Sequence, residues 1–420
     1  MVSAGSIEDH LDAAMKSRQS GRVLEARAHF EAVLKLDPIH PLARNFLGLE
    51  ALAKGDARAG ADHLEQACRG DPNAPELWLN LARAHAQLDE IDAARGALER
   101  ALLLDQRFLP ALISLAQLHE ELGEHKLASD RWSAVLALTA TIGGESPELS
   151  EVIAHARAYV EKDRRQLGEA LDSALRKDLE RASSGDSRRV RAAVDTMAGR
   201  RSIFTNQCHG LHYPFLAADE FFDREHFDWL ERVEAATDEI RGELLSILAG
   251  TDPGLEPYVE QPPGVPRNKW SPLDRSLDWG ALHLWRDGER MDEACSRAPA
   301  TAALVESLPL CRIPGRAPAV FFSILKAGKS IPPHTGVTNV RSIVHLPLIV
   351  PEGCTFRVGG ETRRWVEGQA FVFDDTIEHE AINPTSSDRA LLIFDCWNPY
   401  LSDSEQKMIC KIYQVTSARK

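Results

Sequence analysis

The sequence has no long hydrophobic run, few aromatic residues and no closely paired cysteines. Across 420 residues, no segment approaches the roughly 18 consecutive apolar residues that a membrane-spanning helix needs. The N-terminal stretch is polar and acidic and lacks an apolar signal core, so we expect a cytoplasmic protein that acts away from membranes. The seven cysteines are scattered and never form a C-x-x-C pair, which argues against a disulfide framework or a zinc knuckle.

An excess of positive charge is also missing. The net charge is −14, with 49 Lys and Arg against 63 Asp and Glu. Binding to a polyanion needs clustered basic side chains, so we expect no nucleic-acid partner. The 44% hydrophobic share is that of a soluble globular protein, and at roughly 100–200 residues per domain the length predicts two or three domains.

The first third of the chain repeats with a period of 34 residues and resembles tetratricopeptide repeats. Each unit is predicted to be a helix pair in which a turn residue joins the helices, a small residue lets them pack closely and an Asp-Pro pair closes the unit. A helical bundle with the same period by chance is the alternative. The aligned positions are turn residues Gly21, Gly55, Asp89 and Gly123, small residues Ala26, Gly60, Ala94 and Ala128, large residues Phe30, Leu64, Leu98 and Trp132, and Leu47, Leu81 and Leu115.

A stack of such repeats presents a concave groove, which we expect to bind a peptide or protein partner, although a docking or oligomerisation surface is the alternative. The following segment is rich in Ala, Leu, Glu, Lys and Arg with helical spacing, and the composition changes near residue 200. We therefore predict a repeat domain at 1–148, a helical linker or cap at 149–200, and a third domain at 201–420.

The last hundred residues contain short β-like runs separated by turn residues, with no helix between them. Such a series predicts an all-β sandwich or barrel, for which a jelly-roll (cupin-like) double-stranded β-helix with an open mouth is the natural candidate. The predicted fold class is thus multi-domain α + β, a helical solenoid followed by a double-stranded β-helix. The runs are 319–325, 341–350, 354–360, 362–368, 369–375, 378–383 and 389–397.

Strand alternation sorts the side chains of the run RSIVHLPLIV. One face carries Arg341, Ile343 and His345, and the other is apolar. Polar groups on a largely buried strand need partners, which either a ligand-lined interior or a solvated sheet face supplies.

Two histidines near these strands are candidate metal ligands. His334 precedes the run just described, and His379 lies within the later run FDDTIEHEAIN. Neutral imidazoles suit iron, copper, nickel or zinc, and many non-haem iron oxygenases add a carboxylate two residues after the first histidine. Here that position is Gly336. Because the chain has 15 histidines, this pair alone is a weak signal.

Three further residues strengthen the signal. Arg389 opens the last run, where a bidentate guanidinium is suited to the far carboxylate of a dicarboxylate such as 2-oxoglutarate. Ser323, on the first run, has a hydroxyl for the same carboxylate, and His345 has a ring nitrogen for the carboxylate next to the metal. Together these residues predict an oxoacid site beside a metal.

The motifs PHTG, TNVR, FDD-x-x-EHE and the segment around Arg389, in that order, make residues 205–400 resemble the aspartyl/asparaginyl β-hydroxylase family of iron(II)- and 2-oxoglutarate-dependent oxygenases. Animal members also carry tetratricopeptide repeats ahead of this domain. The resemblance implies iron ligands at His334 and His379, with the glycine at Gly336 as a family feature. It also implies that O2 and 2-oxoglutarate are consumed, with release of succinate, to hydroxylate the β-carbon of an Asp or Asn residue in a peptide.

The resemblance further implies that Ser323 and Arg389 hold the C5 carboxylate of 2-oxoglutarate and that His345 lies near its metal-chelating end. One departure concerns substrate: animal members have two arginines on the strand after PHTG, matching Arg341 and the position of Ile343. We expect Arg341 to contact the substrate.

The roles of some residues near the candidate site have two interpretations. We interpret Asp375 as a partner of a ligating histidine rather than as a ligand. Trp285 and Arg286 either line a substrate groove or are a packed tryptophan and a solvated arginine. For the whole chain, hydroxylation of a free or carrier-bound amino acid and a non-catalytic scaffold with a ligand-sensing domain remain alternatives.

Overall fold

A computed structural model describes residues 5–141 and 146–418, which divide into two compact units. The first unit comprises residues up to 181 with 197–199, and the second comprises 182–196 with 200–420. Helices α9 (Pro147–Arg181) and α10 (Ser184–Met197) account for the segment predicted to be helical, and the boundary between the units falls between them. Among the described residues, no helix is both long and apolar enough to cross a bilayer.

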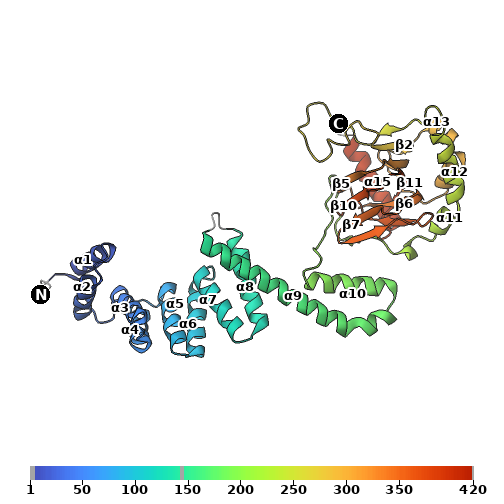
Figure 1. The fold of residues 1–420 in the computed structure, drawn as a ribbon. Coiled ribbons are helices and arrows are strands. Elements are labelled where there is room, and N and C mark those ends of the chain that lie inside the picture. Colours follow the sequence, from blue (N-terminus) through green and yellow to red (C-terminus); the bar gives the residue numbers. More distant parts are fainter. Residues whose placement is uncertain (1–4, 142–145, 419–420) are drawn as a thin grey trace. The chain divides into compact units, whose positions relative to one another are not determined.

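The first unit opens with four helix pairs, as the 34-residue period predicts (Figure 1). All four predicted turn residues have positive φ, with values of 71°, 84°, 58° and 70° in chain order. This left-handed conformation ends the first helix of each pair and favours glycine, which explains the recurring residue type. The pairs are α1 (Ile7–Gln19) with α2 (Val23–Leu36), α3 (Pro41–Ala53) with α4 (Ala57–Gly70), α5 (Pro75–Gln87) with α6 (Ile91–Leu104), and α7 (Leu109–Glu121) with α8 (His125–Thr139).

The small and large columns of the repeat are buried, which confirms their predicted packing roles. At Gly60 an added Cβ would lie 2.6 Å from Cδ2 of Leu52, so the Leu52 side chain would have to shift to admit one. The aspartates that close the units accept a hydrogen bond from the backbone N–H two residues on, and these turns separate successive pairs. The three aspartates are Asp37, Asp71 and Asp105.

The second unit contains two antiparallel sheets. The larger has the order β1-β2-β4-β11-β6-β9, with β3 paired to β2, and the smaller has the order β5-β10-β7-β8. This β-rich domain after helical repeats is the predicted fold class, and all seven predicted runs contain strands. The strands are β1 (Glu256–Pro257), β2 (Trp279–Arg286), β3 (Glu289–Arg290), β4 (Val320–Leu325), β5 (Lys329–His334), β6 (Arg341–Ile349), β7 (Thr355–Val358), β8 (Glu361–Arg364), β9 (Phe371–Phe373), β10 (His379–Asn383) and β11 (Arg389–Trp397).

Strand β5 was not predicted, although it carries His334. Its sequence KSIPPH contains two prolines, which remove backbone donors and normally argue against a strand. In the structure β5 is an edge strand that pairs only with β10, so the missing donors interrupt no second ladder. The edge position explains why a strand with this sequence is stable.

Helices cover the outer face of the larger sheet, while its inner face meets the smaller sheet. Figure 1 shows α11 (Leu230–Ala235) and α12 (Thr237–Leu248) on the side away from β5, β10 and β7. The apolar face of β6, including Val344 and Leu346, packs into the core beneath these helices, so the predicted alternation is confirmed. The unit also contains η1 (Arg224–His226), α13 (Asp292–Arg297), α14 (Pro299–Glu306) and a C-terminal helix α15 (Asp403–Ser417).

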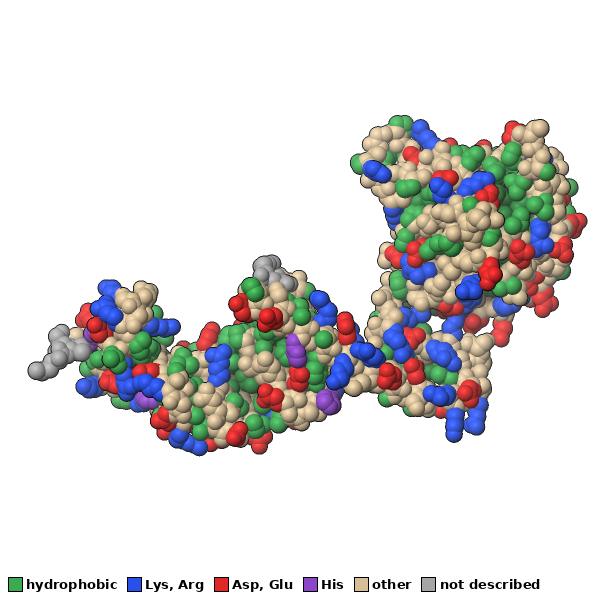
Figure 2. All heavy atoms as spheres, in the orientation of Figure 1, with side chains coloured by type: hydrophobic (Ala, Val, Ile, Leu, Met, Phe, Trp, Pro, Cys, Tyr) green, Lys and Arg blue, Asp and Glu red, His purple; other side chains and the backbone are tan. Residues whose placement is uncertain are grey.

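Acidic and basic side chains are interspersed on the displayed face of each unit (Figure 2). In the repeats some of them pair across successive helix pairs, as Arg58 does with Glu90 at 2.7 Å and Arg95 with Glu124 at 3.0 Å. Such half-exposed pairs each contribute little, about 0–1 kcal/mol.

Candidate active site

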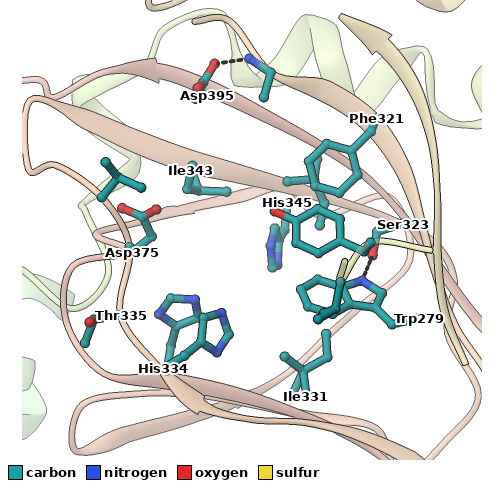
Figure 3. A pocket seen from close by; sticks show the side chains of 18 of the residues that line it. Trp279, Phe321, Ser323, Ile331, His334, Thr335, Ile343, His345, Asp375 and Asp395 are labelled. Carbon is teal, nitrogen blue, oxygen red and sulfur yellow. Dashed lines mark hydrogen bonds between the residues drawn. The ribbon is translucent and has the colours of Figure 1, made fainter. Parts of the chain in front are cut away.

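A cavity of about 430 Å³ lies between the two sheets of the second unit (Figure 3). The close-up shows Ser323 and Trp279 on one side of it, Asp375 and Thr335 on the other, and His345 between. The polar face of β6 therefore lines a cavity rather than a solvated sheet surface. Every residue predicted for the site lines this one cavity: Ser323, His334, Arg341, His345, His379 and Arg389.

The two candidate metal ligands are cross-strand neighbours. His334 on β5 pairs in register with His379 on β10, and their ring centroids are 4.0 Å apart. The Nδ1 of His334 lies 2.8 Å from the carbonyl oxygen of Pro332, and the Nδ1 of His379 lies 3.0 Å from that of Ile377. Because a carbonyl oxygen only accepts, each Nδ1 carries the ring hydrogen and each Nε2 keeps a free lone pair.

Burial keeps both imidazoles neutral. It lowers the pKa of His334, and burial together with the neighbouring His334 lowers the pKa of His379 to about 3. Neutral imidazoles with a fixed tautomer and a free Nε2 are what a divalent transition metal binds. The pair therefore has the protonation state of metal ligands at neutral pH.

Asp375 occupies the space that a side chain at Gly336 would need. A Cβ built on Gly336 would lie 2.1 Å from Oδ2 of Asp375, and the Gly336 N–H donates to the backbone carbonyl of Asp375 at 2.6 Å. Burial raises the pKa of the Asp375 carboxyl to about 7. In the described ranges, no group of three or more His, Cys, Asp or Glu side chains is arranged to hold a metal ion, so the histidine pair stands without a third protein ligand.

Arg389 is a buried cation at one end of the cavity. Its side chain is 1% exposed, and its Nη1 donates to Oγ of Ser323 at 3.2 Å. Ser323 in turn accepts from Nε1 of Trp279 at 3.1 Å, and the guanidinium lies 5.0 Å from the ring centre of Trp365. Burial lowers the pKa of Arg389 to about 10, which still leaves the group charged at neutral pH.

No carboxylate among the described residues pairs with Arg389, and its buried Nε has no hydrogen-bond partner there. A buried charge without a counter-ion costs several kcal/mol, of the order that ion burial costs in proteins. A bound carboxylate between Arg389 and Ser323 would supply both the missing charge and the missing acceptor. This end of the cavity therefore has the charge and the hydrogen-bond donor that an anion would need.

His345 lies between the two ends of the cavity and is buried. Trp365 donates its Nε1–H to Nδ1 of His345 at 3.4 Å, so the ring hydrogen is on Nε2. Burial, with the nearby Arg389, lowers the pKa of His345 well below its usual range. His345 is thus a neutral hydrogen-bond donor.

The other end of the cavity holds a buried ion pair. Nη1 of Arg341 donates to Oδ2 of Asp395 at 2.8 Å, and the N–H of Ala319 donates to Oδ1 at 2.9 Å. Asp395 was not predicted as a site residue. A signal for it exists, because Asp395 shares the face of Arg389 by strand alternation within the otherwise apolar run RALLIFDCW.

An aromatic wall was also missed by the sequence interpretation. Tyr258 stacks on Trp279 with centroids 3.9 Å apart, and Trp270 meets His334 edge-on at 5.0 Å. Lys269 ties this loop to β5 by donating to the carbonyl of Pro333 at 2.7 Å. The loop has no periodic pattern, so only the local rise in tryptophan pointed to it.

Trp285 and Arg286 lie outside the cavity. Trp285 is buried in the core beneath the outer helices, and Arg286 forms a surface ion pair with Glu256. Of the two interpretations, the packed tryptophan and solvated arginine is the one the structure shows.

Comparison with known proteins identifies both parts of the chain. Residues 234–399 match the model of the family described as aspartyl/asparaginyl beta-hydroxylase, and residues 11–75 and 51–118 match tetratricopeptide repeat models. The repeats also resemble the crystal structure of MamA, with 19% identity, a TM-score of 0.31, and coverage of 47% of this chain and 96% of that chain.

Curated relatives match the C-terminal part. The human aspartyl/asparaginyl beta-hydroxylase is 39% identical over 144 residues, which cover 33% of this chain and 19% of that protein. The ornithine lipid ester-linked acyl 2-hydroxylase of Rhizobium tropici is 31% identical over 195 residues, covering 46% of this chain and 65% of that one. The matched segment thus spans about a fifth of the first curated relatives. The C-terminal part of this chain thus matches the aspartyl/asparaginyl beta-hydroxylase family model, and the segment before it matches tetratricopeptide repeat models.

Proposed function

We propose that the chain is an Fe(II)- and 2-oxoglutarate-dependent dioxygenase that hydroxylates the β-carbon of an Asp- or Asn-type residue in a peptide or protein recruited by the repeats. The observation that carries the proposal is the buried, unpaired Arg389 in the same cavity as two neutral histidines with free Nε2 atoms. A dicarboxylate whose far end pairs with a cation and whose near end chelates a metal satisfies both groups at once.

The residues present fit a ferrous ion. His334 and His379 would hold it, each fixed by its Nδ1–H bond to a backbone carbonyl. When bound with 2-oxoglutarate, the metal supplies the chemistry that splits O2, placing one oxygen atom in a C–H bond of the substrate and the other in succinate as carbon dioxide is released. Two protein ligands leave more open positions than three would.

The chain's own side chains orient and shield the reactants. Arg389 and Ser323 bind the C5 carboxylate, and His345 donates its Nε2–H toward the end of the cosubstrate nearer the metal. Trp270 and Trp279 lie against His334, with ring-centroid distances of 5.0 and 6.5 Å, and so limit the rotation of its ring. Asp375, beside the histidines, is an acceptor that can orient a water where a third ligand would stand.

The repeats supply a place for a polypeptide partner. Between α5, α6 and α7 lies a cavity of about 190 Å³ lined by Leu79, Arg83 and Leu98 among others. Clefts between stacked helix pairs accept extended peptides by burying a few apolar side chains. A free or carrier-bound amino acid and the acyl group suggested by the Rhizobium relative are the competing substrates.

Cosubstrate turnover tests the proposal. Anaerobic protein given Fe(II), 2-oxoglutarate and then O2 should form succinate at least slowly, and His379→Ala should abolish this. Arg286→Ala, a surface change outside the cavity, is the matched control and should leave the rate unchanged. Equal inactivity of the wild type and His379→Ala would instead favour a non-catalytic scaffold.

The substrate can be trapped without turnover. Full-length wild-type protein loaded with Zn(II) in place of Fe(II), together with 2-oxoglutarate, is used to capture partners, and the captured polypeptides are then treated with the Fe(II)-loaded enzyme. Mass spectrometry should find one added oxygen on an Asp or Asn residue. An added oxygen on a lipid acyl chain or a free amino acid would overturn the peptide assignment but not the oxygenase chemistry.

A further inference from the structure

The cavity has two differently charged ends, which lie on one face of β11. Arg389 and Asp395 are six residues apart on this strand, which corresponds to about 20 Å of extended backbone. His345 on β6 pairs in register with Ile393, between them. At one end the Arg389 guanidinium has no counter-ion among the described residues. At the other end the Arg341 guanidinium is paired with the carboxylate of Asp395.

At the Arg341 end the positive charge is already neutralised. Asp395 is 1% exposed and holds Nη1 of Arg341, and Asp375 and Glu260 also line the cavity. Ile343 pairs in register with Asp395 and adds an apolar side chain where a second cation would face an acidic substrate. A carboxylate that entered here would be desolvated next to the carboxyl groups of Asp375 and Asp395 and a guanidinium that is already paired.

Two buried polar atoms at this end have no partner among the described residues: Nε of Arg341, a donor, and Oδ1 of Asp375, an acceptor. Both side chains line the same cavity. A carboxamide offers one carbonyl acceptor and two N–H donors, so it can satisfy both atoms. A carboxylate offers acceptors alone and would set an oxygen against Asp375.

We propose that the Arg341 end of the cavity receives a neutral carboxamide, with Arg341 Nε donating to its oxygen and Asp375 Oδ1 accepting from its nitrogen. This inference rests on the proposed function and narrows its substrate: asparaginyl residues are hydroxylated in preference to aspartyl residues. Arg341 and Asp375 would form hydrogen bonds to the side-chain carboxamide of asparagine. Asp395 and Ile343 would disfavour the side-chain carboxylate of aspartate.

The test measures binding without turnover. Full-length protein loaded with Zn(II) and 2-oxoglutarate is titrated with N-acetyl-L-asparagine N-methylamide and with the aspartate analogue, and the affinity of each is measured by calorimetry. The alanine analogue reports the contribution of the peptide backbone alone. We expect the asparagine probe to bind at least about tenfold more tightly than the aspartate probe, the factor for one lost charge-assisted bond.

Two variants test whether Asp395 and Ile343 cause the preference for the asparagine probe. Asp395→Asn should free the Arg341 charge, and Ile343→Arg should add one, so each should narrow or reverse the preference. The second variant also covers the case in which Asp395→Asn does not fold. Glu256→Gln, outside the cavity, should retain the full preference.

Equal binding of the two probes, tighter binding of the aspartate probe or no binding of either would overturn the carboxamide site. These outcomes are separate from those of the succinate assay. Succinate formed without a probe preference removes this inference alone, whereas a loss of all succinate formation removes the proposed function.

Discussion

The repeat unit and the β unit use buried histidines in opposite ways. In the repeats, Nδ1 of His119 lies 2.5 Å from the carboxylate of Glu124, which also accepts from Arg95 in the preceding helix pair. In the β unit, His334 and His379 direct Nδ1 at backbone carbonyls instead. All three rings are largely removed from water, so the partner rather than the burial distinguishes them.

The difference teaches what a buried histidine is for. A carboxylate partner completes a charge network inside the chain and joins one repeat to the next. A carbonyl partner fixes the tautomer but adds no charge, so Nε2 of each of these rings keeps its lone pair. A carboxylate can orient a metal-ligating histidine as well as a carbonyl can, so the feature that sets His334 and His379 apart is the cavity that both rings line.

The largest expected effect comes from removing one histidine of each kind. His379→Ala should lower succinate formation by more than about 100-fold, because even partners of metal ligands contribute 10- to 100-fold. His119→Ala should keep the rate but lower the unfolding free energy of the repeats by about 1–2 kcal/mol, since it leaves Glu124 without its nearest donor. Turnover and thermal melts of both variants measure the contrast. Loss of turnover in His119→Ala would contradict it.

Arg389 provides the next largest effect. Arg389→Met should weaken 2-oxoglutarate binding by about 10- to 150-fold, the range for one hydrogen bond to a charged group. Ligand-free protein should be at least as stable as the wild type, because the variant removes a buried charge with no counter-ion. Calorimetric titration and thermal melts check both parts. Arg286→Met is the surface control; a less stable variant that still binds 2-oxoglutarate would refute the anion site.

Asp375 should make the β unit less stable as the pH rises. Its folded pKa of about 7 exceeds the ordinary 3.8, so between these values the folded chain binds more protons than the unfolded chain. The unfolding free energy then falls by up to about 1.4 kcal/mol per pH unit through that window. Metal-free Asp375→Asn should therefore gain stability over the wild type from pH 4 to 7, with a constant advantage above. Denaturant melts at several pH values measure this; a pH-independent difference would contradict it.

The smallest expected effect concerns packing within the repeats. Gly60→Ala should cost about 1–3 kcal/mol, because its Cβ meets the side chain of Leu52. Gly96→Ala is the matched control, since a Cβ there meets nothing within 4 Å, and it should be neutral or stabilising by up to about 1 kcal/mol. Neither change should alter 2-oxoglutarate affinity. Equal melting temperatures for the two variants would show that the contact between a Cβ at position 60 and Leu52 does not destabilise the repeats.

The sequence predicted features that depend on local patterns. The 34-residue period located the helix pairs and their positive-φ turns, and the alternation in β6 separated cavity side chains from core side chains. The candidate ligands and the Arg389–Ser323 pair were found because the motifs that carry them are short and occur in order. What the structure adds for these residues is their convergence on one cavity.

Features that depend on register or on distant segments were not predicted. The Arg341–Asp395 pair requires that β6 and β11 be neighbours with a particular alignment, which neither run specifies alone. The aromatic loop around Tyr258 and Trp270 has no period and reaches the cavity from well before the β runs. Strand β5 was missed because its prolines are tolerated only at a sheet edge.

The edge position of β5 gives a bound metal a mechanical role. An edge strand with two prolines has few hydrogen bonds to hold it and is a place where opening of the sheet would begin. His334 is the last residue of this strand, and its cross-strand partner is His379. An ion bound by both rings would therefore link β5 to β10. The two metal–nitrogen bonds would then hold both the ion and the edge strand that closes this side of the cavity.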